Sequence, residues 1–477
     1  MNVFSRMTVL SDNQIEQFQK ATEDILENTG FSVEHAELLQ IARKAGAKVE
    51  EAGSRVRIPA PLLRDLLAQV PRTFRVRGAV GNEFTIGTGT PYFLAIVTDP
   101  WIIDYKTQQP RRPCLSDLRR HTTIAQQLDA VAMISRMDFP VTDCDDATSS
   151  LRALEVHLLN HTKHNLVCAA SVESMREWLD LMRILNRGSD LKGSGLMTCA
   201  VGILSPLTLK GLNGDLLLDA CKYDFTVSPT ICPMAGTTAP YSLASTLLQA
   251  NCEAVFTAAL TQMVNPGNPY FYTMGLSVSD MRSGHDLYYT LDKVLWKIAG
   301  VQLAKSYGIP CTVECGGTLT YRCDPQNGAE GILFMLGAFA SGGDILAGLG
   351  SCHNANGMSA EMMVIQQAWF QAAQFLGRGI RTDDLRLGIE NIRQAGPGAH
   401  FLEDDLTLKF LRGDEFFKNE IFDFGGGYEP SLSMLERAHE KVENMTADYR
   451  SPVPESIQED LRRYFHDLYV RKASRPN

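Results

Sequence analysis

The chain has 477 residues, of which 44% are hydrophobic and 21% charged, and its formal net charge is -10 at pH 7. This composition is typical of a globular protein with a large core, and the acidic balance argues against nucleic acid or an anionic membrane surface as the main partner. The chain lacks a run of about eighteen uncharged apolar residues, and its N-terminus lacks the order of a signal peptide. We therefore expect a cytoplasmic protein.

Residues 1–90 predict a helical region with a small hairpin. Ser11 opens an amphipathic pattern that continues to Ile25, and Ile58-Pro-Ala-Pro begins another helix. The short runs at 73–77 and 83–87 alternate as the two strands of a hairpin do. The stretch Asp104-Tyr-Lys-Thr-Gln predicts a turn.

From residue 91 onward, short apolar runs alternate with helical patterns. Eight such runs predict strands at 91–97, 133–140, 165–171, 196–204, 226–234, 269–275, 310–316 and 344–350. This alternation indicates parallel βα units. A closed (β/α)8 barrel of the TIM type is the economical solution, because an open doubly wound sheet would normally show a phosphate-binding glycine loop. We place the barrel at 91–395 and a C-terminal helical extension at 396–477, with helices at 431–442 and 455–469.

The carboxyl ends of the strands are where a barrel holds its chemistry. The residues at or after these predicted ends are mostly aromatic or polar: Tyr92, Phe93, Asp138, Tyr272, Glu314, His353 and Asn354. Strand alternation alone would bury about half of the aromatic side chains in the core. Glu314 follows a β-branched strand, where a carboxylate either has a function or forms a structural salt bridge.

Metal ligands are a weaker interpretation of this sequence. Most of the eleven cysteines are scattered, and we expect them to be free thiols, many of them buried; Cys311, Cys315 and Cys323 offer only a poor zinc pattern. His157, His161 and His164 have ligand spacing on a helical pattern. They precede a strand, at the wrong end of a barrel, so a solvated face is the favoured interpretation.

Four separated segments resemble the trimethylamine methyltransferase (MttB) family. They are Pro233-Met-Ala-Gly-Thr-Thr with the helix and strand that follow, Asp324-Pro-Gln-Asn-Gly-Ala-Glu330, Met358-Ser-Ala-Glu361, and Gly396-Pro-Gly-Ala-His-Phe-Leu402. Members of this family pass a methyl group from a methylated amine to a corrinoid cobalt. Those that act on trimethylamine have pyrrolysine near the Asp-x-Gln stretch, whereas residues 316–326 here are all standard. The chain therefore resembles a non-pyrrolysine member, similar to glycine betaine:corrinoid methyltransferases.

The resemblance implies demethylation of a quaternary amine, glycine betaine first, with proline betaine, carnitine or a tertiary methylamine as alternatives. It implies an aromatic cage for the ammonium, a carboxylate anchor, and two acidic groups that orient the head group or the corrinoid. Our candidates are Tyr92, Phe93, Tyr272 and Tyr321 for the cage, His353 and Asn354 for the anchor, and Glu314 and Glu330 as the catalytic residues that orient the head group or the corrinoid.

The corrinoid (cobalamin) is expected on a separate partner protein, because the chain lacks an Asp-x-His-x-x-Gly loop. We expect no cofactor or metal bound in this chain. Apolar surface on long helices and tail segments predicts a homo-oligomer. Outside this class, a barrel lyase would need a Schiff-base lysine at a strand end, which Lys163, Lys192, Lys210 and Lys222 do not provide, and a betaine-binding module would show two open sheets.

Overall fold

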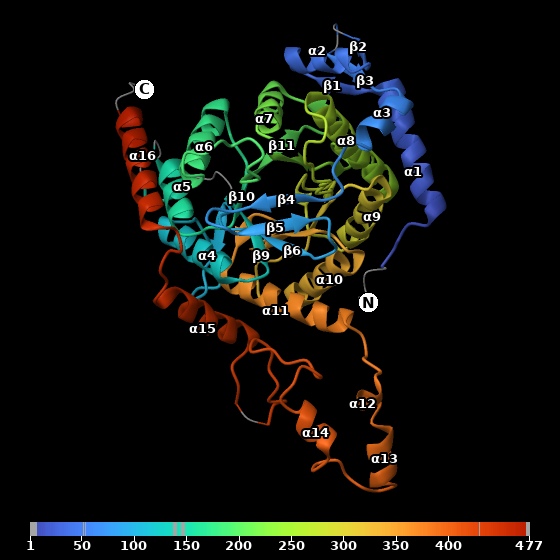
Figure 1. The fold of residues 1–477 in the computed structure, drawn as a ribbon, viewed down its shortest axis with the longest axis vertical. Helices are drawn as coiled ribbons and strands as arrows, with labels where there is room; N and C mark the ends of the chain where they lie inside the picture. Colours follow the sequence, from blue (N-terminus) through green and yellow to red (C-terminus); the bar gives the residue numbers. More distant parts are fainter. Residues whose placement is uncertain are drawn as a thin grey trace.

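A curled parallel sheet forms the centre of the molecule (Figure 1). The computed structural model describes residues 7–50, 52, 54–136, 141–144, 148–428 and 430–473. Within these residues, seven parallel strands lie in the order β13-β11-β10-β9-β6-β18-β17. They are β6 (Tyr92–Ile96), β9 (Val131–Arg136), β10 (His164–Val167), β11 (Met197–Ile203), β13 (Thr226–Ile231), β17 (Thr312–Glu314) and β18 (Ile345–Leu349). Each overlaps a predicted run, so the parallel α/β class is confirmed.

The eighth predicted strand, 269–275, forms only isolated bridges. Tyr270 pairs with Val227 of β13, and Tyr272 pairs with Cys311 just before β17, both in parallel. Backbone hydrogen bonds from Phe271 N to Val227 O (2.9 Å) and from Thr312 N to Tyr272 O (3.0 Å) support these bridges. The segment thus lies between the two edge strands of the sheet, where a regular eighth strand was expected.

Helices follow the strands and cover the outer face of the sheet. They are α4 (Leu115–Gln127), α5 (Ser149–Leu159), α6 (Val172–Leu185), α7 (Gly211–Lys222), α8 (Leu243–Val264), α9 (Asp292–Tyr307), α10 (Pro325–Ser341) and α11 (Ala360–Gly377). Ser242 caps α8 by accepting a hydrogen bond from Ser245 N. The long α8 is apolar all round because the N-terminal helices pack on its other side.

The N-terminal region combines the predicted helices with short strands that sequence periodicity missed. Its helices are α1 (Asp12–Asp24), capped by Ser11, the π-helix Ile25–Thr29, α2 (Ala36–Lys44) and α3 (Ala60–Leu67). A small sheet joins β1 (Phe31–Val33), β2 (Lys48–Glu50), β3 (Arg55–Arg57) and β12 (Thr208–Leu209). Three residues are too few to show alternation, and the pairing with β12 is long-range.

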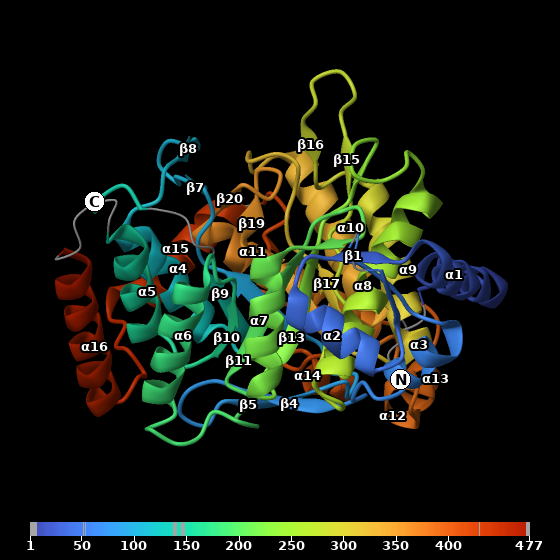
Figure 2. The same ribbon diagram turned by 90° about the horizontal axis from the view of Figure 1, so that it is seen from above.

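The predicted hairpin closes the amino end of the sheet. Its strands β4 (Phe74–Arg77) and β5 (Glu83–Ile86) are antiparallel. Phe74, Val76 and Ile86 pack with buried residues of the large sheet, including Leu94 and Met133. Figure 2 shows β4 and β5 on one side of the molecule and β7, β8, β15 and β16 on the other.

Short strands surround the opposite, carboxyl end. One small sheet contains β7 (Trp101–Ile103), β8 (Pro110–Arg111), β19 (Ser351–Cys352) and β20 (Gly357–Met358), and another contains β14 (Met234–Ala235), β15 (Ser277–Ser279) and β16 (Asp286–Leu287). The predicted turn at Asp104 connects β7 to β8, and its side chain accepts a hydrogen bond from Thr107 N (2.9 Å). The carboxyl end is therefore bordered by short strands and the loops between them, whereas the hairpin β4–β5 covers the amino end.

The C-terminal part first leaves the body and then returns to it. An arm with α12 (Asp384–Leu387), α13 (Ile389–Ala395) and α14 (Asp405–Phe410) projects away from the sheet (Figure 1). The two predicted helices are present as α15 (Met434–Ala447), which packs on α11 and α4, and α16 (Glu455–Ala473), which packs on α5 and α6. Among the described residues, the helices lack the length and apolar character that crossing a bilayer requires.

The prediction of a solvated histidine face was wrong. His157, His161 and His164 are all buried. The Nε2 atom of His157 forms a hydrogen bond with Asn165 on β10 and lies 3.1 Å from Nε2 of His161. His164 forms a hydrogen bond with Thr198 on β11. Burial lowers the pKa of His161 to about 3, so this ring is neutral. The histidines lie between α5 and the sheet, which helical spacing alone could not reveal.

Candidate active site

A cavity of about 430 Å³ opens at the carboxyl ends of the parallel strands, and we call it the mouth cavity. Its floor comes from the strands and from the segment that follows Tyr272: Leu94, Ile96, Ser135, Leu166, Ala200, Ser228, Thr273, Thr312 and Ala347. Its rim comes from the end of β17, the short strands β16 and β19, and the loops beside them: Asp99, Asp286, Tyr288, Tyr289, Glu314, Ser351 and Asn354. This is the end at which parallel α/β barrels place their chemistry.

Two adjacent tyrosines form the aromatic wall of the mouth cavity. The rings of Tyr288 and Tyr289 lie edge to face, with centroids 5.1 Å apart. Asn354 Oδ1 accepts a hydrogen bond from Tyr288 N (2.7 Å). Gly317 leaves room for Tyr289, because a Cβ at this position would lie 2.0 Å from the Tyr289 ring. The tyrosine positions thus depend on backbone contacts that are distant in sequence.

A buried charge cluster lies behind this wall. Lys293 Nζ is 2.9 Å from Glu314 Oε2 and lies over the ring of Tyr288, and the Tyr288 hydroxyl donates to Glu314 Oε1. Burial opposes ionisation of Glu314, but Lys293 and Lys297 outweigh it and hold the pKa of this carboxyl below its ordinary value. Glu314 is therefore an ionised group that fixes one of the cavity tyrosines.

Lys297, one turn beyond Lys293 on α9, is the less satisfied lysine. The Nζ atoms of both lysines lack a hydrogen-bond partner among the described residues, but only Lys293 has an ion pair, with Glu314. Lys297 Nζ lies 4.0 Å from the centroid of the Phe334 ring. Burial lowers the pKa of Lys297 to about 7. A buried amine with this pKa gives up its proton readily near neutral pH.

Lys297→Met is expected to raise the free energy of unfolding at pH 7 by roughly 1 kcal/mol, because it removes a buried ammonium. The unfolded lysine keeps its proton up to its ordinary pKa of 10.5, whereas the folded one loses it near 7. Wild-type stability should therefore rise with pH across this interval, and the Met variant should lose that rise. Urea unfolding at pH 7 and pH 10 tests both effects, with the exposed Lys20→Met as control. A Met variant that is less stable than the wild type, and whose stability rises with pH as that of the wild type does, would contradict both expectations.

Two acidic side chains of the mouth cavity, Asp99 and Asp286, have no lysine or arginine paired with them among the described residues. Asp99 is 5% exposed, and it forms no hydrogen bond or ion pair with any described residue. Burial raises the pKa of Asp99 to about 8. The Oδ1 atom of Asp286 is also buried and has no hydrogen-bond partner within the described residues. Both groups line the cavity, so they are available to a positively charged ligand.

Of the predicted site residues, Glu314 and Asn354 line the mouth cavity. The Asn354 amide is occupied, since its Nδ2 donates to Asp286 O (2.6 Å) while its Oδ1 accepts from Tyr288 N. His353 and Tyr321 lie beside the cavity, with ring centroids 5.2 Å apart. Glu314 and Asn354 thus contribute to the cavity lining, whereas His353 and Tyr321 do not.

The other predicted residues lie elsewhere. Tyr92 begins β6 at the amino end of the sheet, where its ring meets Phe84, and Phe93 packs against Phe370 of α11. Tyr272 points outward, because its hydroxyl donates to Asn251 Oδ1 of α8 (2.6 Å). Glu330 on α10 accepts a hydrogen bond from Leu319 N (2.8 Å) and thereby fixes the preceding loop. Asp138 lies outside the described residues.

Sequence reasoning missed Asp99, Tyr288, Tyr289, Lys293 and Lys297. A signal for the lysines existed, since they stand four residues apart in the otherwise apolar stretch Lys293–Ala299 and must share a helix face. Asp99 follows the predicted strand 91–97 by two residues. The tyrosines lie in an irregular loop with no periodic signal. Among the described residues, no group of three or more His, Cys, Asp or Glu side chains could hold a metal ion.

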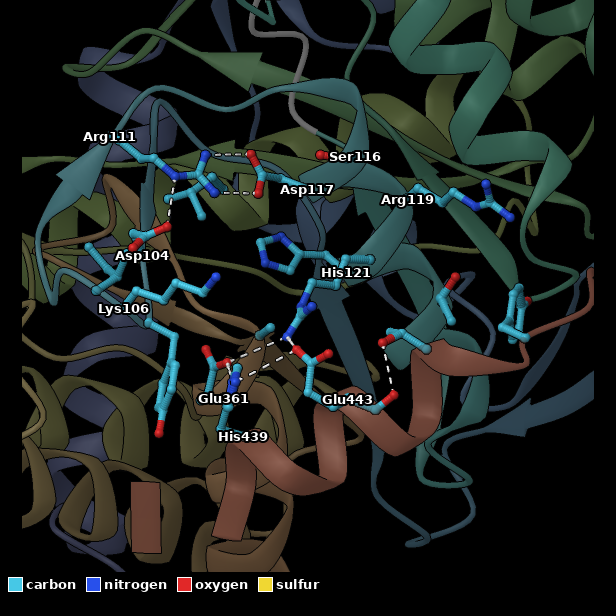
Figure 3. Close-up of a pocket in the computed structure, with 18 residues that line it drawn as sticks. Asp104, Lys106, Arg111, Ser116, Asp117, Arg119, His121, Glu361, His439 and Glu443 are labelled. Atoms are coloured by element: carbon cyan, nitrogen blue, oxygen red, sulfur yellow. Dashed lines mark hydrogen bonds and ion pairs between the residues drawn. The ribbon is translucent and has the colours of Figure 1, made fainter. Parts of the chain in front are cut away.

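A larger cavity of about 550 Å³ lies on the flank, between the β7–β8 turn, α4 and α15 (Figure 3). Its labelled charges are mostly paired: Arg111 with Asp117 (2.6 Å), and Glu361 with His439 (2.8 Å). The first pair joins β8 to α4, and the second joins α11 to the returning helix α15, so both are explained by structure. The mouth cavity, whose acids Asp99 and Asp286 find no cationic partner in the part of the chain that the structure describes, is the better candidate for an active site.

The fold and the mouth cavity define a parallel α/β enzyme with its site at the carboxyl ends of the strands. Residues 1–474 match the family described as Trimethylamine methyltransferase (MTTB). The chain belongs to this family, whose members are methyltransferases that work with corrinoid proteins. The predicted family and enzyme class are therefore confirmed.

Characterised relatives cover nearly the whole chain at low identity. The glycine betaine methyltransferase of Desulfitobacterium hafniense (strain Y51) is 26% identical over 94% of both chains. The proline betaine:corrinoid methyltransferase of Eubacterium limosum is 23% identical over 95% of this chain and 96% of its own. Among solved structures, the Methanosarcina barkeri monomethylamine methyltransferase superposes with a TM-score of 0.51 at 12% identity, covering 98% of this chain and 90% of its own. That likeness supports the fold alone.

Proposed function

We propose that the chain transfers a methyl group from a quaternary amine to the Co(I) of a corrinoid carried by a separate protein. The observation that supports this is the mouth cavity, in which two tyrosines and the unpaired Asp99 line a site without Lys, Arg or His among its described residues. Aromatic faces and carboxylates together attract an ammonium group. The family relationship supplies the methyl acceptor.

The chemistry of a quaternary ammonium suits such a site. Attack by Co(I) on the methyl carbon forms the carbon–cobalt bond with the electron pair of cobalt, while the carbon–nitrogen pair stays on nitrogen. The leaving group is a neutral tertiary amine, so no acid has to protonate it. The residues of this chain would hold the ammonium against Tyr288 and Tyr289, exclude water and orient one methyl group toward the opening. Glu314 acts by fixing Tyr288.

We also propose that the segment 270–272 completes an eight-stranded barrel between β13 and β17. Its two parallel bridges support this, as does the cavity floor, which includes Thr273 between residues of β13 and β17. In this description, residues 1–90 and 396–477 are additions to a barrel of 91–395.

A homo-oligomer remains our proposal for the assembly, and the projecting arm supports it. Large apolar side chains on this arm are exposed, among them Ile380 (92%), Leu402 (77%) and Phe416 (74%). Exposed apolar surface of this kind usually marks an interaction site.

The corrinoid protein is proposed to approach the open mouth, because the hairpin closes the other end.

Glycine betaine is the substrate that the resemblance favours, and proline betaine, carnitine and tertiary methylamines are the alternatives. The test mixes the protein with a corrinoid protein reduced to Co(I) and each amine in turn, including choline, and follows the cobalt absorbance. Formation of methyl-Co(III) with a quaternary amine is the expected result. The same mixture held at Co(II) is the control and should stay unchanged. Methylation by trimethylamine alone, or by none of the amines with a proven corrinoid partner, would overturn the proposal.

A further inference from the structure

We propose that the mouth cavity selects cationic amines that have no acidic group, with Asp99 and Asp286 facing the ammonium and repelling a substrate carboxylate. Choline represents the favoured class and glycine betaine the disfavoured one. The inference rests on the proposed transfer of a methyl group from a quaternary amine, and it differs from the family resemblance in placing choline before glycine betaine.

Asp99 is buried, lines the mouth cavity and lacks a partner among the described residues. An unpaired carboxylate at such a place is costly to ionise, and the pKa of about 8 means that the empty site keeps the proton near neutral pH. A bound cation would supply the missing counter-charge and favour the ionised form. Asp286, with one buried oxygen unpartnered by any described residue, faces the same space.

The orientation of the substrate decides where a carboxylate would lie. Cobalt must approach through the open end, because the hairpin and the floor residues close the other. The transferred methyl group therefore points outward, and the other three substituents on nitrogen point inward. The carboxymethyl arm of glycine betaine would then enter the cavity together with Asp99 and Asp286, where like charges disfavour it.

Nothing cationic in the described lining offsets that repulsion. Lys293 is nearby, but Glu314 already pairs with it. The amide of Asn354 is occupied by Tyr288 N and Asp286 O. A hydroxyl group, in contrast, finds neutral partners in the cavity floor: Ser135, Ser228, Thr273 and Thr312. An alcohol tail fits this set better than an acid.

Binding to the protein alone tests the inference without methyl transfer. Isothermal titration calorimetry at pH 9 would compare choline, glycine betaine and 3,3-dimethyl-1-butanol, the neutral carbon analogue of choline. We expect choline to bind at least about tenfold more tightly than either of the other two, which corresponds to ~1.4 kcal/mol. Glycine betaine binding as tightly as choline, or no binding by any of the three, would overturn the inference.

Two variants assign the effect to the named residues. Asp99→Asn is expected to weaken choline binding at least about tenfold and to reduce the preference over glycine betaine. Asp286→Asn should act in the same direction and keeps the test open if the first variant does not fold. Asp467→Asn, an exposed position on α16, is the matched control and should bind choline as the wild type does. An unchanged choline preference in both cavity variants would overturn the inference.

A pH series separates ionisation of Asp99 from simple packing. Choline affinity of the wild type should rise from pH 7 to pH 9, because below the pKa of about 8 binding must displace the Asp99 proton. Asp99→Asn should lose this rise, whereas any contribution of Lys297 is common to both proteins. Among the described residues, Tyr289 and Cys352 interact electrostatically with Asp99, and Asp286 and Glu314 line the same cavity. The hydroxyl of Tyr289 and the thiol of Cys352 have pKa values raised by burial, so they stay neutral here.

The two proposals fail separately. Choline binding without methyl transfer to an active corrinoid protein would reject the proposed function and leave the selectivity intact. Methyl transfer from glycine betaine, with tighter binding of glycine betaine than of choline, would reject the selectivity and leave the function intact.

Discussion

Glu314→Gln is expected to lower the free energy of unfolding by about 3–5 kcal/mol, because it leaves the buried Lys293 without its counter-ion. The two side chains are 2.9 Å apart, and Lys293 is almost fully buried. The pKa of Glu314 is held below its ordinary value by Lys293 and Lys297 despite burial. Its contribution is therefore present above the unfolded pKa of 4.5 and lost as the pH falls through the lower folded value.

Urea unfolding at pH 7 and at pH 3.5 measures this effect, which should be large at the first pH and smaller at the second. Glu459→Gln on α16 is exposed and should leave the stability unchanged. The double variant Glu314→Gln with Lys293→Met should recover part of the loss, since no uncompensated charge remains. A loss of equal size at both pH values, without recovery, would show that Glu314 acts through packing and not through charge.

Gly317→Ala is expected to destabilise the protein and to abolish most ligand binding at the mouth. The backbone of Gly317 has φ +90°, and a Cβ would lie 2.0 Å from the Tyr289 ring. The backbone conformation alone costs about 1–3 kcal/mol for a residue with a side chain. Because the Tyr289 ring has to move, choline affinity should fall at least about tenfold if this tyrosine contacts the ammonium.

Gly328→Ala is the matched control, because its position in helix α10 is open and a Cβ there would meet no atom within 4 Å. Alanine should stabilise that helix slightly, by up to about 1 kcal/mol. Thermal unfolding, near-ultraviolet circular dichroism of the tyrosines and calorimetric choline binding compare the two variants. If Gly317→Ala matched Gly328→Ala in all three measurements, Tyr289 would not depend on Gly317.

The fold was largely predictable because its strands are local patterns. Runs such as 91–97 and 196–204 are apolar, bounded by turns and separated by helical patterns, and they appear as β6 and β11. The hairpin at 73–87 and the helix capped by Ser11 also depend on neighbouring residues alone. The strands β1 to β3 were missed because three residues are too few to show alternation, and β1 also pairs with β12, which lies far away in the sequence.

The candidate site was less predictable, because the positions of its side chains depend on contacts between segments that lie far apart in the sequence. Position after a strand correctly placed Glu314 and Asn354 at the cavity, but it could not tell that Tyr272 turns outward to Asn251. The side of a strand that faces the inside of the curled sheet depends on sheet curvature and on the helix behind it. Tyr288 and Tyr289 lie in a loop whose shape is set by Asn354 and Gly317, more than 25 residues away.

The sequence by itself determined the parallel α/β class, the family and the end of the sheet at which the candidate cavity opens, because apolar periodicity and motif order are properties of the chain. Only the tertiary structure decided which charges are paired. Glu314 finds Lys293 and Lys297 on α9, whereas Asp99 finds no partner among the described residues. Pairing depends on distances of a few ångströms between distant segments, and at the mouth cavity these distances separate a structural acid from one that is free to bind a cation.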